Sequence, residues 1–263
     1  MNHTDTPAME TQSKEQKRDF IFFVTGFGKF NGVPENPTSD IVKELPEFLR
    51  QKCQDTSLSE NVRKALSFLA TRTETLLIET SAQAVQNEIN VIKNRLQHFQ
   101  SAIVLHLGVH YQAKRFRLEQ CAYNDASFRV PDEKGFQPKN LPILQSCALG
   151  SKMTTSFDVP ALVKRMNQTL PPASDDDSLP LANQSTDPGR FVCNYIYCAS
   201  LDAFDCGQSV SGKHEDSQSS PRTRSLFLHV PPFTAIAPKA QLEFVTQLML
   251  ELCHQHDQYT ALS

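Results

Sequence analysis

Apolar residues gather in short continuous runs along the first half of the chain, and polar or turn-forming residues follow each run. The runs FIFFVT (20–25), TLLIET (75–80) and AIVLHLG (102–108) are typical of strands that are buried on both faces. Between the second and third runs, apolar residues recur at helical spacing and predict an amphipathic helix over 82–100. These residues are Val85, Ile89, Ile92, Leu96 and Phe99. A strand, a helix and a strand in this order predict the βαβ unit of a parallel sheet.

The remaining apolar positions extend this pattern to the end of the chain. Asn36 and Pro37 are typical of an N-cap and a first helical residue, so a short helix is expected after the first strand. The other elements that we expect are strands at 115–123 and 225–230, and helices over 158–170, from Asp187 through Ala203, and over 238–254. Strands that alternate with helices in this way predict one doubly wound α/β domain, which we place at residues 19–256.

Polar stretches flank and interrupt this domain. We expect residues 1–18 to form a disordered leader and residues 257–263 to form a flexible tail. The segments 171–186 and 207–224 are predicted to be exposed loops, the first with room for one short strand. Three consecutive aspartates in the first loop lack the ligand spacing and the glycine of an EF-hand. We therefore interpret them as part of a solvated loop rather than as a cation site.

Composition narrows the class of protein. A hydrophobic share of 39% and a net charge of −3 exclude a disordered chain and give no electrostatic reason to expect a nucleic-acid partner. No apolar run reaches the roughly 18 residues that a membrane span needs. The seven cysteines are odd in number and include no CxxC pair, so neither a disulfide framework nor a metal site is expected. This favours a reducing, cytoplasmic location.

Two residues stand where a parallel sheet places its chemistry, at the carboxyl ends of strands and the N-termini of helices. His229 lies at the end of the predicted strand 225–230, and Cys193 lies near the start of the helix before it. The free N–H groups and partial positive charge of a helix N-terminus favour a thiolate and can hold an oxyanion. A neighbouring imidazole can take the thiol proton and return it to a leaving amine.

Each candidate also has a purely structural interpretation. Free cysteines are among the most buried residue types, so Cys193 is either a nucleophile or, like Cys198, a core residue. His229 is either a base or a strand-end histidine with a structural hydrogen bond. Glu119, in the strand expected at 115–123, can simply form a surface ion pair with Arg117 or Lys114. From spacing alone, these residues support no more than a candidate cysteine hydrolase.

Four stretches taken together point further. They are VTGFGKFNGVPENPTS, LHLGV followed by RLEQCAYNDASFRVPDEKGFQP, DPGRFVCNYIYCASL, and SLFLHVPP. In this order they resemble the signature segments of pyroglutamyl peptidase type I, the pyrrolidone-carboxylate peptidase family of cysteine peptidases. The resemblance runs from Phe20 to Leu252, and the plant-type eukaryotic members are the most similar.

The resemblance implies a single three-layer α/β/α sandwich with a mostly parallel, twisted sheet. It also implies a catalytic triad with Cys193 as nucleophile, His229 as base and Glu119 as acid, and only the resemblance singles out Glu119. The implied activity is hydrolysis of the amide bond after an N-terminal pyroglutamate (5-oxoproline) residue, through a thioester. Pyroglutamyl peptides are then the substrates, no metal or organic cofactor is needed, and the oligomeric state stays open between monomer and tetramer.

The implied substrate pocket is mostly apolar, because the pyroglutamyl ring is a neutral lactam with one donor and one acceptor. Phe27 and Phe30 match two aromatic residues that enclose the ring, and packing of their loop against the core is the alternative. The other matched positions are Asn36, Arg129, Val130, Phe191 and Val192. Among them, Arg129 is assigned to oxyanion stabilisation.

The chain departs from the family pattern at His110 and Tyr111, where members carry small residues. Two bulky side chains at the active-site edge are expected to narrow the pocket or to change the choice of substrate. Two alternatives therefore stay open. One is a cysteine amidohydrolase of altered N-terminal specificity, and the other is a non-catalytic binder of N-blocked peptides on the same fold.

Overall fold

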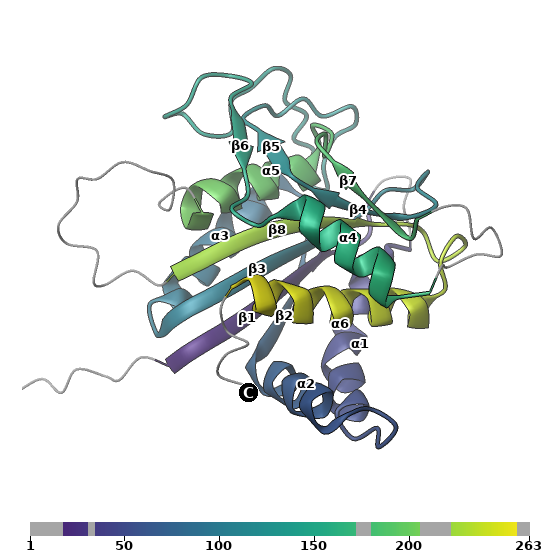
Figure 1. Cartoon of the computed structure of the whole chain (residues 1–263). Coiled ribbons are helices and arrows are strands. Elements are labelled where there is room, and N and C mark those ends of the chain that lie inside the picture. Colours follow the sequence, from purple (N-terminus) through teal and green to yellow (C-terminus); the bar gives the residue numbers. More distant parts are fainter. Residues whose placement is uncertain (1–17, 31–34, 172–179, 206–221, 257–263) are drawn as a thin grey trace, which may run out of the picture.

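The computed structural model describes residues 18–30, 35–171, 180–205 and 222–256. The expected leader up to residue 17, the tail, the aspartate run and residues 207–221 of the expected loop lie outside this part of the chain, whereas Arg18 and residues 222–224 belong to strands. Within it, a central sheet has six strands (Figure 1). In order across the sheet they are β2 (Thr73–Ile78), β1 (Arg18–Phe27), β3 (Phe99–Val109), β8 (Arg222–Val230), β4 (Phe116–Glu119) and β7 (Ala182–Ser185).

Strand direction divides the sheet into two parts. The neighbours β2, β1, β3 and β8 are all parallel, as the continuous apolar runs predict. β4 runs antiparallel to β8, and β7 is parallel to β4. The start of β4 therefore lies beside the end of β8, with Arg117 opposite His229. This reversal brings β4 to the same edge as the carboxyl ends of the parallel strands.

Helices cover both faces of the sheet and form the outer layers (Figure 1). One layer contains α1 (Pro37–Lys52), α2 (Glu60–Arg72), α4 (Val159–Thr169) and α6 (Pro238–Gln255). The other contains α3 (Ala82–Leu96) and α5 (Val192–Ser200), the latter continued by the π-helical turn η1 (Leu201–Asp205). The expected three-layer α/β/α sandwich with a mostly parallel sheet is confirmed.

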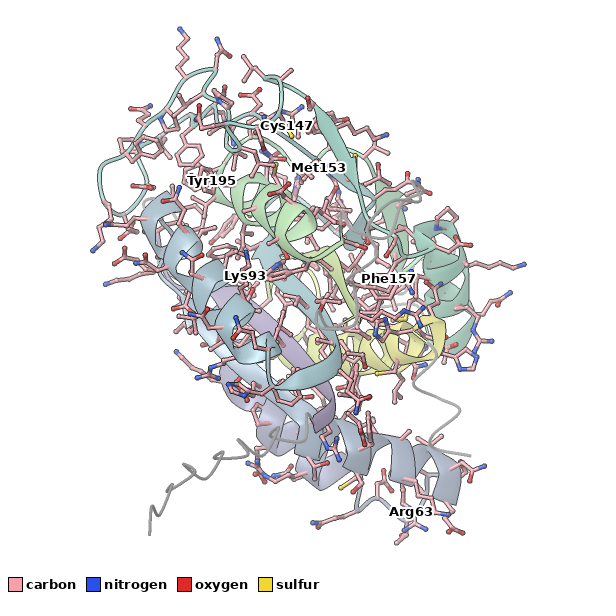
Figure 2. The ribbon with its side chains drawn as sticks, turned by 90° about the vertical axis from the view of Figure 1, so that its left-hand side faces the viewer. Arg63, Lys93, Cys147, Met153, Phe157 and Tyr195 are labelled. Carbon is pink, nitrogen blue, oxygen red and sulfur yellow. The ribbon has the colours of Figure 1, made fainter. Side chains whose placement is uncertain are left out.

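Side chains that alternate along β1 pack against the helices on opposite faces of the sheet. Phe20, Phe22 and Val24 pack into a cluster with α1, α2, α4 and α6. Ile21 and Phe23 point the other way, into a cluster with α3. Figure 2 shows the side chains of both layers, with Phe157 beside α4 and α6 and Tyr195 on α5. Because both faces are covered, the strand is apolar at every position from Phe20 to Val24.

Asn36 begins α1 as its N-cap, as the sequence predicts. Its Oδ1 accepts hydrogen bonds from the backbone N–H and the hydroxyl of Thr38, and its Nδ2 donates to the carbonyl of Gly28. The helix is longer than the short one expected and runs to Lys52. Gly26 allows its close approach, because a β carbon there would lie 2.5 Å from the carbonyl oxygen of Thr38.

The sequence-based boundaries of two segments are corrected. Phe99 does not belong to the helix over 82–100 but opens β3, after α3 has ended at Leu96. The single strand expected at 115–123 is two strands, because the chain leaves the main sheet at Gln120. After it, β5 (Cys121–Tyr123) pairs with β6 (Lys152–Thr154) in a separate two-stranded sheet.

The helix that carries Cys193 begins at Val192 rather than at Asp187. Gly189 has a φ of 79°, which interrupts any helix, and Asp187 accepts the N–H of Gly189 in a local turn. The sequence analysis missed α2 altogether, although Val62, Leu66 and Leu69 already have helical spacing. The one short strand expected within 171–186 is β7.

Candidate active site

Cys193 occupies the second position of α5 and is half-buried. The N-cap of this helix is Phe191, whose side chain makes no capping hydrogen bond. The first N–H groups of a helix have no partner within the helix, so they are available to an anion beside the sulfur. The later start of the helix therefore places Cys193 closer to the N-terminus than the sequence predicts.

Two buried polar residues of α5 fix this helix against the chain segment that holds Glu119. Asn194 accepts the N–H of Tyr123 at 2.8 Å and donates to the carbonyls of Tyr123 and Asp125. The hydroxyl of Tyr197 donates to the backbone carbonyl of Glu119 at 2.8 Å. Sequence reasoning missed both contacts, because their partners lie more than sixty residues away.

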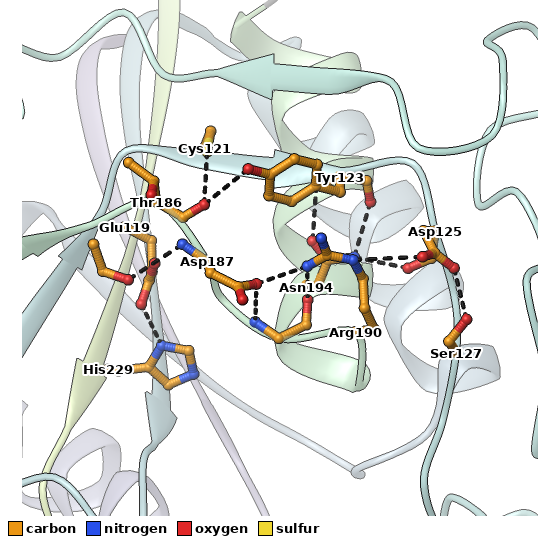
Figure 3. A network of polar contacts seen from close by, with 12 residues as sticks. Glu119, Cys121, Tyr123, Asp125, Ser127, Thr186, Asp187, Arg190, Asn194 and His229 are labelled. Carbon is orange, nitrogen blue, oxygen red and sulfur yellow. Dashed lines mark hydrogen bonds and ion pairs between the residues drawn. The ribbon is translucent and has the colours of Figure 1, made fainter.

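His229 and Glu119 lie together below the cavity floor, and both side chains are almost completely buried. Nδ1 of His229 is 2.8 Å from Oε1 of Glu119 (Figure 3). The alternative interpretation of Glu119 as the partner of a basic residue in a surface ion pair is wrong. Its carboxylate is 0% exposed and faces the imidazole of His229. A carboxylate in this position fixes the tautomer and orientation of the ring.

Opposing effects act on the imidazole of His229. Burial lowers its pKa, but hydrogen bonds to Cys193 and Glu119, together with their charges, outweigh burial and raise the pKa to about 9. The imidazole therefore interacts with Glu119 and with Cys193. Within the described chain, the three residues of the predicted triad lie at one site.

Gly108 provides the space that the sulfur of Cys193 occupies. It pairs with His229 across β3 and β8. A β carbon at Gly108 would lie 2.8 Å from Sγ of Cys193 and 2.6 Å from the ring of Phe227. The sequence analysis did not select this glycine, because the need for a bare backbone arises only from a helix that follows much later in the chain.

Cys193 and His229 border a cavity of about 1010 Å³ at the carboxyl ends of the parallel strands, and Glu119 lies behind His229. Phe27, Phe30 and Phe191 form its aromatic wall beside the end of β1. The rings of Phe30 and Phe191 are 5.8 Å apart, and Phe191 packs edge-on against Phe128 at 4.8 Å. Phe27 is buried in the core with one edge on the cavity, whereas Phe30 is half-buried.

The other predicted pocket residues occupy different surroundings. Arg129 and Val130 line the cavity and are exposed at its rim. Asn36 also lines it, although all its side-chain hydrogen bonds described above hold the loop and helix α1. Val192 differs from the expectation, because its side chain is fully buried in the core and is not among the lining residues.

A polar network that the sequence did not reveal supports the opposite wall (Figure 3). Arg190 forms ion pairs with Asp187 at 2.7 Å and with Asp125 at 3.5 Å, and its guanidinium lies over the ring of Tyr123. Asp187 is the acidic residue in the cavity lining, and Arg190 balances its charge. Asp187 is thus engaged by a cation of the protein itself.

His110 and Tyr111 follow β3, the strand between β1 and β8, and line the cavity beside His229. The rings of His110 and His229 are perpendicular, with centroids 6.0 Å apart. Burial, followed by the positive charges of Arg117 and His229, lowers the pKa of His110. Its imidazole is therefore neutral near pH 7 and can either donate or accept a hydrogen bond.

Two further properties concern the described residues only. None of their helices is both long and apolar enough to cross a bilayer. No group of three or more histidine, cysteine, aspartate or glutamate side chains in this part is arranged to hold a metal ion.

Sequence comparison extends these observations to known proteins. The model of the pyroglutamyl peptidase family matches residues 53–242, which is more than half of the chain and includes the three residues of the predicted triad. A pyrrolidone-carboxylate peptidase from Enterococcus faecalis is 26% identical over 208 residues, which are 79% of this chain and 76% of the relative. One from Streptococcus pyogenes is 24% identical over the same shares.

Solved structures show the same fold. The pyrrolidone carboxyl peptidase from Thermococcus litoralis covers 90% of this chain and 95% of its own, with a TM-score of 0.61 and 18% identity. The enzyme from Fervidobacterium islandicum also gives a TM-score of 0.61, with 19% identity and coverage of 90% and 99%. The expected likeness to plant-type members stays a prediction. By the extent of the family match, this chain belongs to the pyroglutamyl peptidase family.

Proposed function

We propose that this protein is a cysteine peptidase that hydrolyses the amide bond after an N-terminal pyroglutamate residue. The observation that carries the proposal is the line from Glu119 through His229 to Cys193, at a helix N-terminus on the wall of a cavity. Membership of the pyroglutamyl peptidase family supports the choice of substrate.

The lining of the cavity suits a pyroglutamyl ring. This ring is neutral, with an apolar body, and the aromatic wall of Phe27, Phe30 and Phe191 offers it apolar surface. An enzyme for ordinary N-termini would need a carboxylate for the α-ammonium group. Asp187, the acidic residue in the described lining, is already paired with Arg190.

The reaction then proceeds in two steps. The thiolate of Cys193 attacks the carbonyl carbon of pyroglutamate, and the oxyanion is held by the N–H of Cys193 and by Arg129. Protonated His229 donates its proton to the leaving amine as the C–N bond breaks, which leaves a thioester on Cys193. His229 next removes a proton from water, whose attack on the thioester releases pyroglutamate and restores the thiol. Glu119 holds the ring of His229 in position throughout.

A nucleophilic thiol needs a reducing environment, and the six cysteines in the described part of the chain are all free thiols. A cytoplasmic location is therefore part of the proposal.

The decisive experiment is release of a fluorescent amine from its pyroglutamyl amide under reducing conditions, with the corresponding prolyl amide in parallel. The prolyl compound has the same ring size but carries a charged secondary amine in place of the lactam. We expect release from the pyroglutamyl amide alone, and a loss of at least about a thousandfold in Cys193→Ala and Cys193→Ser.

Other outcomes would favour the alternatives. Equal release from both amides would indicate a cysteine amidohydrolase of altered specificity. Release that survives in Cys193→Ala would show that the nucleophile is wrong. If no amide is cleaved and a thiol-selective alkylator modifies Cys193 no faster than the half-buried Cys53 and Cys147, a binding protein is the better interpretation.

A further inference from the structure

The cavity extends well beyond the aromatic wall, across the carboxyl edge of the sheet. The strand order places β1 with Phe27 first, then β3 with His110 after it, then β8 with His229, and finally β4 with Arg117. Figure 1 shows β8, β4 and β7 next to one another at this end. We refer to Glu119, His229 and Cys193 together as the catalytic line. It therefore lies between an apolar end and a polar end of the larger cavity.

A second, smaller cavity of about 330 Å³ adjoins the polar end. It shares two lining residues, Gln112 and Arg117, with the larger cavity. Its other lining residues are Ala113, Lys114, Arg115 and Asn183. The two shared residues place the smaller cavity next to the larger one, on the side of β4.

Three cations line this adjoining region, namely Lys114, Arg115 and Arg117, and we refer to them as the basic mouth. No acidic residue is among the residues that line the smaller cavity. The described residues contain no ion pair to any of the three, whereas Arg190 on the neighbouring wall already has two carboxylate partners. This positive cluster is notable on a chain whose net charge is −3.

Two polar atoms beside the basic mouth have no partner among the described residues. They are Nδ1 of His110, in the larger cavity, and Oδ1 of Asn183, in the smaller one. Buried polar atoms are rarely left without a hydrogen bond. These two buried atoms add to the polar character of the wall beside the basic mouth.

The chemistry of the proposed reaction determines which part of a substrate reaches the basic mouth. The pyroglutamyl ring occupies the aromatic wall, and the leaving amine must face His229 to receive its proton. The rest of the peptide then continues from His229 toward Arg117, its neighbour across β8 and β4. Adjacent strands are about 5 Å apart and each extended residue covers about 3.4 Å. The first or second residue after pyroglutamate therefore meets Arg117.

We infer, on the basis of the proposed function, that the basic mouth recognises an acidic side chain in the first two residues after pyroglutamate. The preferred substrates are thus acidic pyroglutamyl peptides, and Arg117 determines this preference with Lys114 and Arg115. His110 and Tyr111 line the larger cavity beside His229 and precede the basic mouth in the chain.

The test measures kcat/KM for release of free pyroglutamate from a set of tetrapeptides. The peptides carry glutamate, glutamine or lysine at the first or second position after pyroglutamate, and the readout is the ratio between the glutamate and lysine peptides. We expect the wild-type ratio to exceed one and to fall as the salt concentration rises. Each partly exposed ion pair should contribute roughly two- to fivefold.

Charge reversal provides the variants. Arg117→Glu should invert the ratio. Arg117 belongs to β4, so its replacement can also disturb the sheet. Lys114→Glu combined with Arg115→Glu changes only residues that precede this strand and should lower the ratio. The ratio cancels any loss that is common to both peptides. The matched control is Lys93→Gln, an exposed cation near the far end of α3 (Figure 2), which should leave the ratio at its wild-type value.

These measurements distinguish a failure of the inferred preference for acidic peptides from a failure of the proposed function. If pyroglutamate is released equally from the glutamate and lysine peptides, or if Arg117→Glu keeps the wild-type ratio, this inference is wrong and the proposed function stands. If pyroglutamate is released from no peptide and from no simple amide, the proposed function fails and the inference fails with it.

Discussion

The sulfur of Cys193 lies where the side chain of residue 108 would be, if that residue had one. A β carbon on Gly108 would be 2.8 Å from Sγ and 2.6 Å from the ring of Phe227. Such distances are far below van der Waals contact, and Gly108 also pairs with His229 across the sheet. The absence of a side chain on β3 therefore allows α5 to bring its N-terminus against the histidine.

Gly108→Ala is expected to reduce kcat of the pyroglutamyl amide assay at least about a hundredfold, because the displaced sulfur loses its alignment with His229. The matched control is Gly28→Ala, where the nearest atom to the new β carbon is the Ile78 carbonyl oxygen at 3.7 Å. Near-normal turnover in Gly108→Ala would contradict the placement of Cys193.

The raised pKa of His229, about 9, predicts a loss of activity at alkaline pH. The imidazolium is the proton donor to the leaving amine, so kcat/KM should fall as pH rises through the apparent pKa of the Cys193–His229 pair. Glu119→Gln removes a charge that raises this pKa, and the alkaline limb should then move to lower pH. A pH–rate profile of both proteins checks this, and an unmoved limb would argue against the role of Glu119.

The same pKa has a consequence for stability. Between pH 6.5 and about 9 the folded protein holds a proton on His229 that the unfolded chain releases. The stabilising contribution of this group is therefore complete below pH 6.5 and is lost as pH rises to about 9. Thermal unfolding followed across this range should show a smaller fall in Tm for Glu119→Gln than for the wild type.

Asn194→Ala tests the attachment of α5 to the segment that carries Glu119. The change removes the acceptor of the Tyr123 N–H and the donor to the Asp125 carbonyl, whereas the Tyr123 carbonyl keeps the N–H of Asp125. We expect the free energy of unfolding to fall by roughly 2 to 4 kcal/mol, the scale of two buried groups left without hydrogen bonds. Asn94→Ala, an exposed position of α3, should change it by less than about 0.5 kcal/mol in denaturant titrations.

Phe30→Ala tests the aromatic wall. Phe30 is half-buried and contacts Phe191, so its removal should raise KM for the pyroglutamyl amide roughly three- to tenfold with little change in Tm. Phe136→Ala removes an aromatic ring that is 39% exposed and does not line the cavity, and KM should stay unchanged. An unchanged KM in Phe30→Ala would remove this residue from the pocket.

Phe27 is unsuitable for the same test, because it is 2% exposed and part of the core. Truncation of a buried phenylalanine costs about 3 to 5 kcal/mol, so a loss of activity would report unfolding rather than binding. The two aromatic residues that the sequence grouped together thus contribute differently to the fold.

Local patterns in the sequence identify the elements whose signal spans only a few residues. Continuous apolar runs identified β1, β2, β3 and β8, and helical spacing identified α3, α4 and α6, because burial imposes these periods within a few residues. The cap at Asn36 and the position of His229 at a strand end follow from the same local rules. These were sufficient to place candidate chemistry at the carboxyl edge of a parallel sheet.

The tertiary structure alone decided how that chemistry is assembled. Glu119 could be selected by family resemblance but not by any pattern, since its hydrogen bond to His229 spans 110 residues. The reversal of β4, the bare backbone of Gly108 and the attachment of α5 through Asn194 likewise depend on which elements become neighbours. Local sequence restricts the dihedral angles of a segment, whereas pairing between strands and helices is set by packing across the whole domain, and the site is built from such pairings.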